Sequence, residues 1–244
     1  MKNKIIIIYV LGIHLFLTVV LLKSDFIDRI KHRFGIYVPK KSIKVSNHFH
    51  QMLQFHKRMD GNVPEKAVIF IGDSITQGLC VSAIACPAVN YGIGGDTTIG
   101  VLKRLNCYNS IKRASAIVVA IGINDMKYLS NNEIIKNYQT IIDRLPSNIP
   151  VIISAILPID EEIRSDCINW NKRIKALNMQ LKKLASIKKN IFFVNIGPHL
   201  VDNAGNLDDI YHDGDGIHLN SKGNAILIKA LKYAISNAQQ TVFN

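Results

Sequence analysis

The sequence predicts an α/β fold in which a parallel sheet carries helices on both faces. Two observations lead to this prediction: short apolar runs of strand length, and longer segments of helical periodicity that alternate with them. With 244 residues, 48% of them hydrophobic and 20% charged, the chain is long enough for one ordinary core and too apolar to be disordered. We find no repeat with a period of about 20–50 residues, which argues against a solenoid.

Five apolar runs are the expected strands. The first run is bounded by Pro64 and Gly72, as expected for a strand buried within a sheet. The second run is the weakest of the five. In chain order the expected strands are 67–71, 88–91, 116–121, 151–156 and 191–194.

Helical spacing of apolar residues marks four segments, and Ser221 is the expected N-cap of the last one. Because parallel strands end at the same edge of their sheet, functional residues are expected in the loops at the carboxyl ends of the strands. The expected helices are 46–59, 131–145, 170–184 and a last helix that starts at 221 and extends to about 235.

An apolar stretch stands near the N-terminus. Residues 5–22 carry no formal charge, and as a helix they would extend about 27 Å, just enough for the core of a bilayer. Lys2 and Lys4 precede the stretch, and no small-residue cleavage site follows it. We therefore expect an uncleaved signal anchor rather than a cleaved signal peptide or a buried helix.

This anchor determines the expected domain organisation. We expect a transmembrane helix over residues 1–22, a basic juxtamembrane segment over 23–64 and a globular domain over 65–240. Basic residues lie on both sides of the span, so the charges alone favour neither topology. Because short basic tails commonly stay inside, we expect the globular domain outside the cytoplasm, in the periplasm or the extracellular space. The pattern predicts no oligomeric state.

The chain is strongly basic. Lys and Arg number 30 and Asp and Glu 18, a net charge of +12 that favours anionic partners. No recognition motif for nucleic acid accompanies the charge, so we expect no nucleic-acid partner. Residues 167–201 contain no acidic residue, and their cations form either a solvated helix face or a contact with an anionic membrane or glycan.

The cysteines and histidines favour structural roles over metal binding. Four cysteines without a C-x-x-C pair are typical of free thiols, although Cys80 and Cys86 could pair in an oxidising compartment. His48, His50 and His56 are close in sequence, but a polar helix face explains them better than a metal site does.

Two loops at expected strand ends carry residues suited to nucleophilic catalysis. Ser74 follows Gly72 and Asp73 at the end of the first strand, where a serine can act as a nucleophile or cap the next helix. Glycines crowd the loop at 92–95, and such a backbone can turn N–H groups toward an anion, with Gly95 as the candidate donor. The third glycine of a dinucleotide fingerprint is missing.

Two further loops complete the set. Asn124 follows the strand at 116–121, and its amide can donate to a developing oxyanion or form an Asx turn. Asp215 and His218 are three residues apart, so one short loop can hold carboxylate and imidazole together while the other ring nitrogen faces a serine. The alternative is a calcium site, although the spacing and the closing Glu of an EF-hand are missing. Its ligands would be Asp208, Asp209, Asp213 and Asp215.

The four loops together resemble the SGNH, or GDSL-type, hydrolase family of esterases and lipases. That family carries a Ser in G-D-S, a Gly, an Asn in G-x-N-D and an Asp-x-x-His near the C-terminus. All four blocks stand here in that order, at 72–75, 94–97, 122–125 and 215–218, and the resemblance covers about residues 65–237. The string G-I-G-G-D-T-T also resembles the branch that includes the catalytic subunits of platelet-activating-factor acetylhydrolase.

The resemblance implies a fold and a set of residue roles. The fold is a flavodoxin-like three-layer α/β/α sandwich, in agreement with the pattern of strands and helices. The implied catalytic triad is Ser74, His218 and Asp215. The implied oxyanion hole consists of the backbone N–H groups of Ser74 and Gly95 together with the Asn124 side chain. No metal or organic cofactor is implied.

We therefore expect a membrane-anchored serine esterase for short-chain or acetyl esters on a small molecule, lipid, glycan or cell-wall polymer. An O-acetyltransferase, a lysophospholipase or a thioesterase could use the same triad. A membrane-tethered binding module with an inactive hydrolase fold is the non-enzymatic alternative, and the presence of all five implied site residues argues against it.

Overall fold

The computed structural model describes residues 9–14, 17 and 45–243. The expected signal anchor at 5–22 and the juxtamembrane segment up to residue 44 lie largely outside these residues. Within the part of the chain that is described, no helix is both long and apolar enough to cross a membrane. Nothing in that part supports the anchor, so the anchor, the extracytoplasmic location and the sequence-derived domain limits stay predictions.

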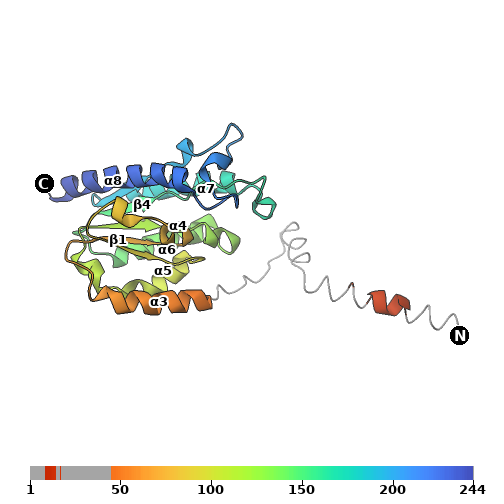
Figure 1. The fold of residues 1–244 in the computed structure, drawn as a ribbon, viewed down its shortest axis with the longest axis horizontal. Coiled ribbons are helices and arrows are strands. Elements are labelled where there is room, and N and C mark those ends of the chain that lie inside the picture. The colour runs from red at the N-terminus through yellow and green to blue at the C-terminus, as the bar shows by residue number, and fades with distance from the viewer. Residues whose placement is uncertain (1–8, 15–16, 18–44, 244) are drawn as a thin grey trace. The chain divides into compact units, whose positions relative to one another are not determined.

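The sheet of the globular unit is parallel throughout. Within residues 45–243 its strands have the spatial order β2-β1-β3-β4-β5, and all five runs expected from the sequence are strands (Figure 1). Gly72 of β1 is in register with Gly92 of β2 and Ala120 of β3, so three strands end at the same level. The strands are β1 (Val68–Gly72), β2 (Ala88–Gly92), β3 (Ala116–Ala120), β4 (Val151–Ser154) and β5 (Ile191–Val194).

Helices cover both faces of the sheet, which confirms the α/β sandwich. In Figure 1, α8 lies along one face of the sheet and α3, α5 and α6 lie on the other. The longer helices are α3 (Asn47–Asp60), α5 (Thr98–Arg104), α6 (Asn131–Arg144), α7 (Trp170–Ala185) and α8 (Ser221–Phe243), and α4 (Ser74–Gln77) is a single turn. Short 3-10 helices occupy Val81–Ala83, Leu105–Cys107, Asn109–Arg113, Asn124–Lys127, Ser165–Cys167, Gly197–His199 and Asp209–Tyr211.

The alternation of side chains along β1 builds a separate core on each face. Ile69 and Ile71 pack with α5, α6 and α7, whereas Val68 and Phe70 pack beneath α8. All four side chains are buried. Each such side chain contributes about 1.5–3 kcal/mol on burial. Since both faces of the strand are covered, apolar residues are favoured at every position, and the strand appears in the sequence as a continuous apolar run.

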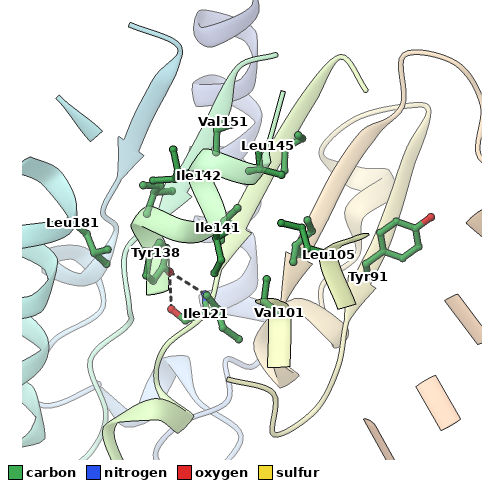
Figure 2. Close-up of a cluster of buried hydrophobic side chains, with 14 of the residues drawn as sticks. Tyr91, Val101, Leu105, Ile121, Tyr138, Ile141, Ile142, Leu145, Val151 and Leu181 are labelled. Atoms are coloured by element: carbon green, nitrogen blue, oxygen red, sulfur yellow. Dashed lines mark hydrogen bonds between the residues drawn. The ribbon is translucent and has the colours of Figure 1, made fainter. Parts of the chain in front are cut away.

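One tyrosine ties helix α6 to the carboxyl end of β3. The Tyr138 hydroxyl donates to the Ile121 carbonyl oxygen at 2.6 Å and accepts from the Ile121 N–H at 3.3 Å, as Figure 2 shows within the apolar cluster. Tyr138 is fully buried, and burial raises the pKa of its hydroxyl. This contact holds the backbone immediately before Gly122, where the third sequence block begins.

Helix α3 is part of the compact unit that spans residues 43–244. Ser46 caps it by accepting from the Phe49 N–H, and Phe49 is buried. Asp60 at its end is buried and accepts from the Tyr91 hydroxyl at 2.7 Å, from the Asn109 N–H at 2.8 Å and from the Ser110 hydroxyl. Helix α3 therefore anchors the segment that leads into β3.

The three clustered histidines of α3 are separated by their environments. His56 is buried and bonds to the Tyr108 hydroxyl at 3.0 Å, whereas His48 and His50 are exposed. Burial and the positive charge of Arg104 lower the pKa of His56 to about 4, so its imidazole is neutral. Among the described residues, no group of three or more His, Cys, Asp or Glu side chains could hold a metal ion.

We predict that a fragment starting at Ser46 unfolds cooperatively and that a fragment starting at Glu65 is less stable by several kcal/mol. The shorter fragment loses Phe49 from the core and leaves the N–H groups around Asn109 without the Asp60 carboxylate, at about 1–3 kcal/mol for each buried unpaired group. Urea unfolding of the two fragments measures the difference. Equal midpoints and slopes would show that α3 does not stabilise the unit.

Candidate active site

A strand-to-helix turn at the end of β1 presents Ser74. A Cβ atom on Gly72 would lie 2.4 Å from the Ala120 carbonyl oxygen and 2.0 Å from the Thr76 hydroxyl, so only glycine fits at this position. The Asp73 side chain accepts from the Ile75 N–H at 3.1 Å and caps the single turn α4. The turn therefore brings the Ser74 side chain, half-buried, to the carboxyl edge of the sheet.

The structure brings Ser74, His218 and Asp215 into one chain of hydrogen bonds. The His218 Nε2 atom lies 2.7 Å from the Ser74 hydroxyl oxygen, although 144 residues separate them. On the other side of the ring, Nδ1 bonds to the Asp215 carboxylate. Because Nδ1 faces the carboxylate, the neutral ring carries its proton there and leaves Nε2 free to accept from the serine.

Hydrogen bonds from its own loop keep the Asp215 carboxylate ionised. Burial raises its pKa, but bonds from the His218 side chain and from the backbone N–H groups of His218 and Ile217 outweigh burial and lower the pKa to about 2. The two backbone bonds measure 2.8 and 2.9 Å. The loop before α8 thus fixes both the position and the charge of the carboxylate.

The two remaining predicted residues lie on adjoining loops. Gly95 has a φ of +73°, and a Cβ atom placed on it would meet nothing within 4 Å, so the backbone conformation rather than crowding requires glycine there. Asn124 donates through Nδ2 to the Asp96 carbonyl oxygen at 3.0 Å. This bond links the Asn124 amide to the loop that carries Gly95 and leaves the second Nδ2 hydrogen for another acceptor.

A buried arginine holds these loops from behind. Arg104 is fully buried and donates to four acceptors: the Gly72 carbonyl at 3.0 Å, the Tyr91 carbonyl at 2.7 Å, the Asp96 carboxylate at 2.8 Å and the Tyr108 hydroxyl at 2.9 Å. Sequence reasoning missed Arg104, because its sequence context resembles that of any cation on a helix.

A second buried carboxylate connects the third sequence block to helix α5. Asp125 accepts from the Thr98 N–H at 2.9 and 3.0 Å and from the Thr98 hydroxyl. Burial raises the pKa of Asp125 to about 6 although the Thr98 bonds oppose the shift. The Asp of G-I-N-D therefore fixes the N-terminus of α5, while the neighbouring Asn124 points toward the second loop.

Two polar side chains, His48 of α3 and Gln77 of α4, connect helix α3 to the carboxyl edge of the sheet. The Gln77 side-chain oxygen accepts from the Gly94 N–H at 2.5 Å, and the His48 Nε2 atom lies 3.2 Å from that oxygen. His48 of α3 is thus linked through Gln77, at the end of α4, to Gly94, the glycine beside Gly95. The sequence pattern contained no signal for this connection, because Gln77 is one polar residue in a short turn.

His212 supports the loop that carries Asp215. Its Nδ1 atom accepts from the backbone N–H groups of Gly214 at 2.9 Å and Gly216 at 3.4 Å, the residues on either side of Asp215. The ring is buried and its Nε2 atom has no hydrogen-bond partner among the described residues, with the Asp160 carboxylate 3.6 Å away. The Asp160 N–H also donates to the Gly216 carbonyl at 2.8 Å.

One detail differs from the sequence interpretation, and two others bear on alternatives that it left open. Ser221 is the first residue of α8, and the capping side chain is Asn220, which accepts from the N–H groups of Lys222 and Gly223 at 2.9 and 3.1 Å. Either residue type can cap a helix, and the pattern located the cap one position too late. Cys80 and Cys86 are exposed free thiols. The Asp208 side chain, a ligand in the calcium alternative, instead accepts from the Ile210 N–H.

A polar depression of about 370 Å³ surrounds the serine and the histidine. Asn220 and Asn224 line it together with Ser74 and His218, so the open side of the hydroxyl–imidazole pair faces polar side chains.

The comparisons with known proteins identify the class. Residues 70–226 match the sequence model of the GDSL-like Lipase/Acylhydrolase family, and the chain belongs to this family. It is a carboxylic ester hydrolase.

Curated relatives belong to one group of acetylhydrolases. The chain is 26% identical over 191 residues to Platelet-activating factor acetylhydrolase IB subunit alpha1 of Rattus norvegicus, covering 73% of this chain and 80% of the relative. It is 28% identical over 186 residues to the alpha2 subunit of the same organism, covering 71% and 77%.

Solved structures are similar over the same region. A protein from Streptococcus pneumonia described as a platelet activating factor is 28% identical, with a TM-score of 0.70 over 77% of this chain and 92% of the other. A GDSL-like lipase from Bacteroides thetaiotaomicron has the same fold, with a TM-score of 0.67 and 23% identity over 76% and 98% of the two chains.

We predict that His212→Leu lowers kcat for a short-chain ester by about 10–10², with KM little changed, because the loop around Asp215 loses its acceptor and the hydrogen-bond chain from Asp215 through His218 to Ser74 loosens. His212→Asn should keep kcat within a few-fold of the wild type, since the Asn side-chain oxygen can stand in for Nδ1. His199→Leu, at an exposed histidine, is the control. If the Asn and Leu variants lose the same activity, the acceptor role is wrong.

We predict that Asp73→Asn gains stability relative to the wild type as pH rises from 4 to 8. Burial, reinforced by the charges of Asp96 and Asp125 and opposed by the Ile75 N–H, raises the pKa of Asp73 to about 7. The folded wild type therefore binds a proton that the unfolded chain has released, and its stability falls as pH rises through this range.

The gain should be on the order of 2–4 kcal/mol in urea-unfolding free energy between the two pH values. Asp209→Asn, at an exposed carboxylate, is the matched control and should show no such trend. A difference between Asp73→Asn and the wild type that does not change with pH would contradict the prediction.

Proposed function

We propose that this hydrolase is a serine esterase for short-chain acyl esters, acetyl esters above all, with Ser74 as nucleophile, His218 as general base and Asp215 as its carboxylate partner. The observation that carries the proposal is the 2.7 Å contact between His218 Nε2 and the Ser74 hydroxyl, with Nδ1 of the same ring on Asp215. Nucleophile, base and orienting group thus follow one another in the order that acyl transfer requires.

The proposed reaction proceeds in two halves. Ser74 Oγ attacks the ester carbonyl while His218 Nε2 takes its proton, and the resulting tetrahedral intermediate collapses as His218 returns the proton to the leaving alcohol. Water then attacks the acyl-enzyme with help from the same imidazole, releasing the acid. Asp215 stays ionised throughout, because its pKa is about 2, and stabilises the imidazolium.

The backbone N–H groups of Ser74 and Gly95 and the Asn124 amide are the proposed oxyanion donors. The positive φ of Gly95 and the bond from Asn124 to the Asp96 carbonyl support this assignment, because they tie two of the donors to the same loop. Such donors act chiefly on the transition state, where the carbonyl oxygen carries most charge.

The preference for short acyl groups has two supports. The depression beside Ser74 is lined by Asp213 and Ser221 as well as by Ile75 and Leu219, and its polar groups favour a polar alcohol or a small acyl group over a long apolar tail. The curated relatives are named as acetylhydrolases, and one solved structure with this fold is an acetyl xylan esterase, with 24% identity and a TM-score of 0.57.

We predict unequal losses when the site residues are replaced. Ser74→Ala and His218→Ala should each lower kcat by about 10⁴–10⁶, and the double variant by little more, because both belong to one unit. Asp215→Ala should cost less. Asn124→Ala should cost about 10²–10³ with KM little changed, since its bond strengthens in the transition state. Steady-state kinetics on esters of increasing acyl length measure these effects.

The control is Ser82→Ala, which replaces an exposed serine that is not among the proposed site residues. Release of free acid identifies hydrolysis, whereas transfer of the acyl group to a sugar hydroxyl would identify the O-acetyltransferase alternative. If a folded Ser74→Ala protein keeps the turnover of Ser82→Ala, Ser74 is not the nucleophile.

A further inference from the structure

A second concave site lies away from the serine. A groove of about 440 Å³ runs between α7 and the segment that follows β5, where β5 forms one edge of the described sheet. None of the five residues assigned to the triad and oxyanion hole lines it. Its apolar lining includes Ile156, Ile174, Met179, Phe193, Pro198 and Val201.

Two of the three amide side chains that line the groove, Asn171 and Asn178, are already satisfied by the protein, while the exposed Asn195 accepts from the Gly197 N–H through its oxygen. Asn178 accepts from the Ile156 N–H at 2.9 Å and donates to the Ile156 carbonyl at 2.8 Å. Asn171 forms the same pair of bonds with Ile159, at 2.9 and 2.7 Å. These amides therefore offer little hydrogen bonding to a ligand, and the floor of the groove behaves as an apolar surface.

Two lysines supply the charge of the groove. Lys175 and Lys182 both line it, both are exposed, and neither forms an ion pair with a carboxylate of the described chain. They are seven residues apart on α7, which places them on one face about 10 Å from each other. No acidic residue occurs between residues 167 and 201, and Asp202, next to the lining residue Val201, is the first carboxylate after α7.

We propose that this groove binds a single-chain anionic amphiphile, such as a fatty carboxylate or an alkyl phosphate. The apolar tail lies over Phe193 and Ile174, and the head group pairs with Lys175 or Lys182 at the rim. The volume is within the range of about 300–1,000 Å³ that small-molecule sites occupy. Charge complementarity selects an anion over a neutral or cationic amphiphile, and the satisfied amides select a tail over a polar chain. The inference does not depend on the catalytic assignment.

The test uses the full chain and a fatty acid that carries a photoreactive diazirine on its tail. After irradiation, mass spectrometry locates the label, which we expect on α7 and on residues 193–205. Excess laurate should compete for the label, and dodecyltrimethylammonium, with the same tail and the opposite charge, should not. Label confined to the peptide that contains Ser74, or no specific label, would overturn the proposal.

Matched charge variants decide whether the ligand binds through the lysines of the groove or is attracted by the positive charge of α7 as a whole. Lys175→Glu with Lys182→Glu should lower labelling by about tenfold. Lys172→Glu with Lys183→Glu changes the net charge by the same amount on the same helix outside the groove, and should keep labelling within about twofold. An equal fall in both double variants would overturn the groove as the site.

Two further experiments test whether the apolar tail binds in the groove and whether the ligand is a single-chain amphiphile or a membrane surface. Met179→Asp, inside the groove, should lower labelling, whereas Gln180→Asp, the exposed neighbour, should not. Vesicles of phosphatidylglycerol should compete less well than laurate at equal anion concentration. If the vesicles compete as well as laurate does, the basic face of α7 binds a membrane surface and the single-chain site is wrong.

Discussion

The architecture of the active site depends on one buried guanidinium. Arg104 donates to the carbonyl groups of Gly72 in β1 and Tyr91 in β2 and pairs with Asp96, whose own backbone carbonyl accepts from Asn124. Breaking a buried pair of this kind by removing one partner typically costs about 3–5 kcal/mol, because the other charge is left without compensation. The loops that carry Ser74 and Gly95 therefore share one support, and Asn124 is joined to it through the Asp96 carbonyl.

Backbone N–H groups and the Thr98 hydroxyl, rather than cations, hold the other carboxylates of the site. Asp125 accepts from Thr98, and Asp73 accepts from the Ile75 N–H at the start of α4. Each of these carboxylates organises the first turn of a helix next to the catalytic edge. The acidic residues of the G-D-S and G-x-N-D blocks thus serve the geometry of their neighbours, while Asp215, tied by its own loop and by His218, is the one that faces the imidazole.

The strands could be predicted from sequence because their signals are local, and the proposed triad could be named because the family's motifs carry its three residues. β1, β3 and β4 are buried on both faces and read as apolar runs, and Asp215 and His218 stand three residues apart. Arg104 and His212 could not be predicted, because their roles depend on acceptors and donors that only the folded chain assembles. The seven-residue helix α5 was also not predicted from the sequence, since so short a segment shows little hydrophobic periodicity.

The connection from His48 through Gln77 to Gly94 bears on how the family's unit should be delimited. The family match begins at residue 70, whereas His48 belongs to a helix that ends at Asp60. The shared motifs thus contain the residues proposed for the chemistry, but they do not contain every residue that supports those residues. Exchange of the segment before the first motif, in natural relatives or in engineered chimaeras, is therefore a route to adjusting the loop that carries Gly94 and Gly95 without altering any motif residue.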